Sequence, residues 1–120
     1  MSKYQLGEFE EIVLLTVAIL NGRTSTAGQA SSSSEAYGVA ISDEIEKRLK
    51  RKVSLGAMQT SLRRLEEKKL LKSEFGEATK VRGGKRKRFF TLTNFGKQAL
   101  REAKDQRMGL WNAVPEFVLK

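Results

Sequence analysis

The chain has 120 residues, enough for one domain with a buried core and too few for two. Its composition is globular, with 39% hydrophobic and 31% charged residues, and its formal net charge is +9. Cysteine and histidine are both absent, which excludes disulfide frameworks, thiol nucleophiles, imidazole bases and zinc sites of the Cys/His type. We therefore expect a cytoplasmic protein without a metal or cofactor.

The positive charge is concentrated in the middle of the chain. Residues 1–50 have a formal balance of −2, residues 51–93 of +9 and residues 94–120 of +2. Such a concentration attracts polyanions, with a generally basic, solvated surface as the alternative interpretation. The apolar run at residues 12–20 is too short for a membrane span, and Glu8, Glu10 and Glu11 lie where a signal peptide would be basic. We expect neither feature.

Apolar side chains at spacings of three and four predict a first helix over residues 7–21. The glutamates in its first turn favour the positive end of the helix dipole. Asn21 and Gly22 both tolerate a left-handed conformation, so we expect the helix to end there. Residues 23–35 contain four consecutive serines and no large apolar side chain, which predicts a flexible loop.

Two further helices follow, joined by a short turn. The first opens at Tyr37 and Gly38 and extends to about Leu49, with apolar side chains at i, i+4 spacing. Ser54 is a good N-cap for the next helix, over residues 55–69. The apolar face of that helix comprises Leu55, Met58, Leu62 and Leu65. Its opposite face is small or neutral at first and then basic; it includes Gly56, Ala57, Gln59, Thr60, Arg63, Arg64 and Glu67.

The pattern changes to strands after residue 70. Residues 70–75 can form one strand, and residues 89–92 form the stronger one by β-propensity. Gly83 and Gly84 lie between them and indicate a turn, so we expect a β-hairpin with a basic tip. The basic residues are Lys80, Arg82, Lys85, Arg86, Lys87 and Arg88.

A last helix is expected to begin near Asn94, capped by Thr93, and to end or kink at Pro115. Its apolar stripe is larger than a small domain easily covers, which indicates a partner surface. The alternative is that the stripe packs on the first helix of the same chain.

Helix, helix-turn-helix and hairpin is the order of a winged helix-turn-helix, so we expect a mostly α fold with a small β-hairpin. Residues 1–93 would form the DNA-binding domain and residues 94–120 a C-terminal dimerisation helix and tail. In this geometry the third helix enters the major groove, while the hairpin reaches an adjacent backbone or minor groove. The predicted contacts with double-stranded DNA are Ser54, Gly56, Ala57, Gln59, Thr60, Arg63 and Arg64, together with the six basic hairpin residues.

The chain resembles the PadR family of bacterial transcriptional regulators. The matching stretches are LGEFE at residues 6–10, AYGV at 36–39, VSLGAMQTSLRRLEEKKLL at 53–71 and GEATKVRGGKRKRFFTLTNFGKQAL at 76–100. The resemblance implies a homodimeric DNA-binding regulator, usually a repressor, of the short subtype whose single C-terminal helix packs against the partner's first helix. It also implies a pseudo-palindromic site. Family members generally carry a tyrosine where this chain has Gln59, and a tighter connection than residues 23–35.

Three other interpretations remain open. Some relatives bind planar aromatic compounds between the subunits, so an effector is possible; the candidate dimer or ligand residues are Phe9, Phe95, Ala99, Ala103 and Trp111. A basic RNA-binding protein would explain the charge, but not the third helix or the apolar stripe. An enzyme is the least expected class, because Glu66 and Glu67, like Glu10 and Glu11, are helix neighbours expected to be solvated surface charges.

Overall fold

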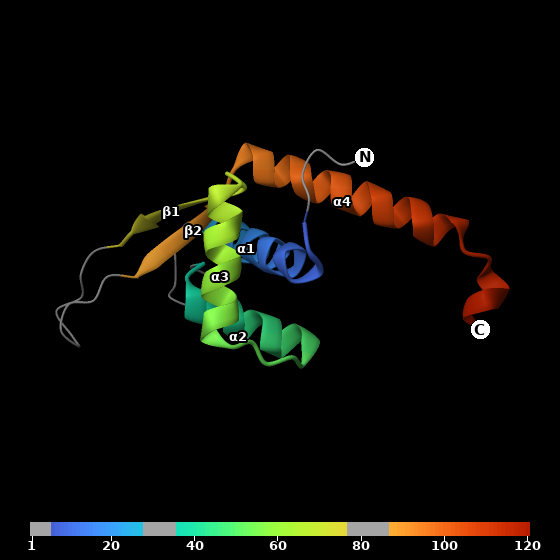
Figure 1. Cartoon of the computed structure of the whole chain (residues 1–120), viewed down its shortest axis with the longest axis horizontal. Coiled ribbons are helices and arrows are strands. Elements are labelled where there is room, and N and C mark those ends of the chain that lie inside the picture. Colours follow the sequence, from blue (N-terminus) through green and yellow to red (C-terminus); the bar gives the residue numbers. More distant parts are fainter. Residues whose placement is uncertain (1–5, 28–35, 77–86) are drawn as a thin grey trace.

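The computed structural model describes residues 6–27, 36–76 and 87–120. The elements are α1 (Glu8–Ala27), α2 (Gly38–Leu49), α3 (Leu55–Glu67), β1 (Leu71–Phe75), β2 (Arg88–Leu92), α4 (Asn94–Ala113) and a 3₁₀ turn, η2 (Glu116–Leu119). Three helices thus precede one antiparallel hairpin and a long final helix (Figure 1). The predicted fold class is confirmed.

Helix α1 is the centre of the molecule. Figure 1 shows it behind α3, with α2 on one side and α4 on the other. It contacts α2, α3, α4 and β2, and its apolar side chains are the middle of the core. The buried apolar residues are Val13, Leu14, Val17, Leu20, Ala36, Ile41, Ile45, Met58, Leu62, Leu65, Leu70, Leu71, Phe90 and Ala99.

The predicted end of the first helix is wrong, because α1 continues through Asn21 and Gly22 to Ala27. Asn21 does not end the helix; its side chain joins α1 to β2. The Asn21 Nδ2 donates to the Phe90 carbonyl at 3.2 Å, and its Oδ1 accepts from the Leu92 N–H at 2.9 Å. Residues 28–35, the rest of the predicted loop, lie outside the described residues.

Helices α2 and α3 agree closely with expectation. The Ser54 hydroxyl caps α3 by accepting from the Ala57 N–H at 3.1 Å, as predicted. Lys50 ends α2 in the left-handed region, with φ of 54°. The apolar faces are shorter than predicted, because Leu49 and Leu55 are 50% and 60% exposed. Leu49 is the last residue of α2 and Leu55 is the first residue of α3, so both lie beside the connecting turn and outside the core.

The hairpin strands pair from Leu71 opposite Leu92 to Phe75 opposite Arg88. The Phe90 N–H also donates to the Ala36 carbonyl at 2.8 Å, so the segment before α2 is joined to β2. Both predicted strands are confirmed. The tip, with Lys80, Arg82, Lys85 and Arg86, lies outside the part of the chain that the structure describes.

The acidic first turn of α1 makes three ion pairs with three different parts of the chain. It reaches the turn between α2 and α3, the residue after α3, and the middle of α4. The pairs are Glu8–Arg51 at 3.2 Å, Glu10–Lys68 at 2.9 Å and Glu11–Arg107 at 2.8 Å. Glu10 and Glu11 are only 13% and 15% exposed, so the expectation that they are solvated surface charges is wrong. All three glutamates position neighbouring elements, in addition to the dipole role expected of them.

Helix α4 is buried only in its first turns, and further along it contacts α1 through the Glu11–Arg107 pair. The Thr93 hydroxyl accepts from the Gly96 N–H at 3.0 Å and donates to the Lys69 carbonyl at 2.7 Å. Ala99 is buried in the core, and Leu100 packs partly against it. The end of the helix extends past α1 and stops before Pro115, as predicted (Figure 1).

Candidate nucleic-acid interface

The exposed face of α3 begins with small and neutral side chains. Gly56, Ala57 and Gln59 are exposed, and Thr60 is half-buried. Apart from Leu55, the first turn after the Ser54 cap exposes no bulky or charged side chain. A surface of this kind allows another molecule to approach the α3 backbone closely.

On one side of α3, a groove of about 850 Å³ separates it from the hairpin and the start of α2. From α3 it is lined by Gln59, Thr60 and Arg63, and from the hairpin by Lys87 and Arg88. The structure therefore brings together predicted DNA contacts that are more than twenty residues apart in sequence. Tyr37, Leu55, Gly56 and Glu66 also line this groove.

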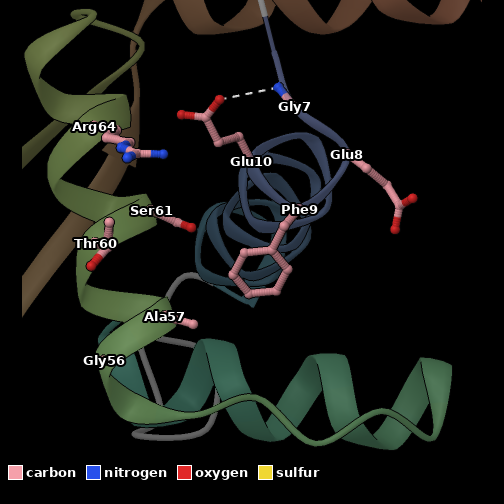
Figure 2. A pocket seen from close by; sticks show the side chains of 9 residues that line it. All are labelled: Gly7, Glu8, Phe9, Glu10, Gly56, Ala57, Thr60, Ser61 and Arg64. Carbon is pink, nitrogen blue, oxygen red and sulfur yellow. Dashed lines mark hydrogen bonds between the residues drawn. The ribbon is translucent and has the colours of Figure 1, made fainter.

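On the other side of α3, a smaller groove of about 500 Å³ separates it from the first turn of α1 (Figure 2). Arg64 extends from α3 toward Glu10 in this view. Burial raises the pKa of Glu10, but the hydrogen bond from the Gly7 N–H and the positive charges of Lys68 and Arg64 outweigh it and hold that pKa below its usual value. The adjacent residues Arg63 and Arg64 thus line different grooves.

Each cation of the larger groove has a partner in the folded chain. Arg63 Nε lies 3.7 Å from Glu67, and Arg88 Nη2 lies 2.9 Å from Glu66. The Lys87 ammonium lies 4.3 Å from the centre of the Tyr37 ring. The Tyr37 ring in turn packs edge-on against Phe89, on β2. Of these cations, Arg88 has the shortest ion pair, whereas Arg63 and its partner Glu67 are both largely exposed.

Sequence reasoning missed Glu66. It was expected to be a solvated surface charge, and that expectation is wrong: its side chain is only 31% exposed and pairs with Arg88. The partner comes from a strand 22 residues later in the chain, so α3 alone gave no signal for it. Glu44 was also missed, and it is buried between Arg23 of α1 and Arg48.

The predicted dimer or ligand residues do not gather in one place within the chain. Trp111 lines a groove of about 430 Å³ between α1 and α4, whereas Phe9 lines the groove between α1 and α3. Phe95 is 51% exposed in the first turn of α4. Ala99 lies in the core of its own chain, and Ala103 is half-buried.

Two kinds of feature are missing from the described residues. In residues 6–27, 36–76 and 87–120, no three acidic side chains gather as metal ligands. No described helix is both long and apolar enough to cross a bilayer.

Comparisons with known proteins agree with this architecture. Residues 30–102 match the family described as "Transcriptional regulator PadR-like family". Among solved structures, a PadR family transcription regulator from hypervirulent Clostridium difficile is 26% identical, with a TM-score of 0.62 over 89% of this chain and 97% of that one. A PadR-like transcription factor from Bacteroides fragilis is 22% identical, with a TM-score of 0.66 over 87% and 84%. RosR of H. salinarum, at 18% identity, has a TM-score of 0.64 over 96% and 86%. No curated protein matches the chain.

Proposed function

Since the chain belongs to the PadR-like family of transcriptional regulators, we propose that it binds double-stranded DNA with α3 in the major groove and the hairpin on the adjacent backbone. The observation that carries the proposal is the larger groove, where neutral side chains of α3 lie beside cations of both α3 and β2. Neutral polar groups suit base edges, and cations suit phosphates.

The individual roles follow from side-chain chemistry. Gln59 and Thr60 are neutral polar groups that would read base edges, and Gly56 allows the backbone to approach. Lys87 and Arg63 would contact phosphates on either side of the groove. The Ser54 oxygen accepts a hydrogen bond within α3, which leaves its O–H to donate to a phosphate oxygen.

The far end of the molecule supports a homodimer. A contiguous stretch of α4 and η2 exposes large apolar side chains, which a monomer rarely leaves in water. They are Met108, Leu110, Trp111, Val114, Phe117, Val118 and Leu119, each between 36% and 76% exposed. In the proposed dimer, this stretch covers α1 of the partner, where Leu15 is also exposed. Two α3 helices about 34 Å apart would then recognise a pseudo-palindromic operator, with repression as the outcome.

Fluorescence anisotropy with two labelled duplexes at about 150 mM salt tests this function. One duplex carries the DNA upstream of the protein's own gene, and the other a scramble of equal length. We expect the first to bind about a thousandfold more tightly. Equal, salt-dependent binding to both would instead indicate an architectural or RNA-binding role, and no binding to either would overturn the proposal.

A second candidate is the binding of a planar aromatic effector beside Trp111. The supporting observation is the groove between α1 and α4, where Leu15, Leu100 and Met108 form an apolar wall and Arg101 and Lys104 a basic rim. Because Trp111 is the only tryptophan, its emission reports on this groove directly. Titration with 2-naphthoate, a planar aromatic anion that suits the basic rim, is expected to quench this emission to saturation and to weaken DNA binding. A linear, unsaturable quench would exclude the site.

A further inference from the structure

We propose that Glu66 increases sequence specificity by holding Arg88 away from DNA. Only on a matching sequence does a DNA phosphate replace the Glu66 carboxylate as the partner of Arg88. The inference rests on the DNA-binding function proposed above and assigns a role to an acidic residue within a basic groove. In this arrangement Glu66 occupies the place of a phosphate while the protein is free or on a random sequence.

The geometry around Arg88 is a closed network between α3 and both strands. Arg88 Nη2 donates to Glu66 Oε1 at 2.9 Å, and its Nε donates to the Ser73 hydroxyl at 2.8 Å. That hydroxyl donates to Glu66 Oε2 at 2.5 Å. The guanidinium also lies 5.5 Å and 5.9 Å from the ring centres of Phe75 and Phe90. The Arg88 guanidinium therefore has partners on α3 and on both strands.

This network is not explained by stability alone. The Arg88 side chain is 49% exposed, and an ion pair with one partner so open to water contributes little to folding. Glu66 also lines the groove itself, beside Arg63 and Lys87. A carboxylate there repels any phosphate backbone that enters the groove and therefore weakens DNA binding. Its presence in a DNA-binding groove calls for a separate function.

We assign Glu66 the function of increasing the difference in affinity between matching and non-matching DNA sequences. On a scrambled duplex, α3 gains no base contacts, and Arg88 remains paired with Glu66. On a matching site, base contacts draw α3 fully into the major groove, and a phosphate comes close enough to replace the carboxylate. Glu66 thus suppresses the non-specific electrostatic part of the affinity more than the specific part.

The test is Glu66→Gln, measured on the scrambled and upstream duplexes over a range of salt. On the scrambled duplex we expect affinity to rise about three- to tenfold and the slope of log K against log salt to steepen by about one unit, for one added phosphate contact. The ratio between the two duplexes should fall. Asp105→Asn makes the same charge change on α4, outside the groove, and should leave the ratio unchanged.

Two further variants assign the effect to Arg88. In an Arg88→Gln background, Glu66→Gln should no longer change the salt slope; a persistent change would mean general charge repulsion and overturn the proposal. Ser73→Ala retains both charges but loses the bridging hydroxyl, so it should change affinity and salt slope in the same direction as Glu66→Gln, and more weakly.

If Glu66 were purely structural, its variant would lower affinity for both duplexes and lower the melting temperature. Wild-type protein that binds neither duplex would refute the DNA-binding function itself; wild-type binding with a Glu66→Gln variant indistinguishable from Asp105→Asn would refute only this inference.

Discussion

Glu44 is a buried carboxylate that joins two helices. Both oxygens accept from the Arg23 guanidinium, at 3.0 Å and 2.9 Å, and Arg48 Nε donates to one of them at 2.6 Å. The hydrogen bonds from Arg23, together with Arg48, outweigh burial and lower the pKa of Glu44 from 4.5 to about 2. The Arg23–Glu44 ion pair joins the last part of α1 to α2, in the region where the sequence predicted a loop.

Glu44 should make stability depend on pH in the acid range. Because its folded pKa is depressed, its contribution is complete above about pH 4.5 and is lost as the pH falls toward 2. A shift of this size corresponds to about 3 kcal/mol. We expect Glu44→Gln to lower the free energy of unfolding by about 2 kcal/mol at pH 7 and to flatten the acid dependence.

Urea unfolding at fixed protein concentration, repeated from pH 7 to pH 2, measures both effects. Glu46→Gln, an exposed position on the same helix, is the matched control and should retain the wild-type pH dependence. An equally steep acid loss in Glu44→Gln would show that another group is responsible.

At the scale of elements, the sequence predicted α3 and α4 well because their information is local. Ser54 and Thr93 cap the helices that follow them, and Pro115 lies just beyond the end of α4. The end of α1 could not be predicted in this way, since Asn21 is held by the backbone of a strand about 70 residues later. Glu66 was missed for the same reason, because its partner Arg88 arrives with the hairpin.

The continuity of α1 can be tested at Gly22. An added Cβ there meets nothing within 4 Å, so Gly22→Ala should stabilise the protein by up to about 1 kcal/mol through helix propensity. If the helix instead ended at Gly22 in a left-handed conformation, the same change would destabilise it. Thermal unfolding distinguishes the two signs.

Gly96→Ala is the opposing control in α4. Its Cβ would lie 2.2 Å from the Leu70 carbonyl oxygen and 2.7 Å from Leu92 Cδ1, so the backbone must move. We expect a loss of about 1–3 kcal/mol in the same measurement.

Helix α3 and the hairpin, the two elements proposed to contact DNA, should differ in their effects on sequence preference and on salt dependence. Thr60→Ala on α3 is expected to change the preference between duplexes by about 1–3 kcal/mol while leaving the salt slope unchanged. Lys87→Ala, directly before β2, should weaken binding to every duplex and flatten the slope by about one unit. Salt titrations by anisotropy separate these effects, and equal losses on all duplexes for Thr60→Ala would contradict base reading.

At the scale of the whole molecule, the exposed apolar end of α4 governs assembly in the proposed dimer. Trp111→Glu places a charge in that surface and should convert the protein to a monomer in light scattering. Affinity for a two-site operator should then fall about a hundredfold, because the second α3 is no longer tethered. Asp105→Asn leaves the apolar side chains intact and should remain dimeric. A Trp111→Glu protein that is still a dimer would place the interface elsewhere.

The acidic first turn of α1 joins two distant parts of the chain. Glu10 pairs with Lys68, the residue that follows α3, and its neighbour Glu11 pairs with Arg107 of α4. Two adjacent side chains of one helical turn therefore connect the helix proposed to read DNA with the helix that carries the exposed apolar stretch.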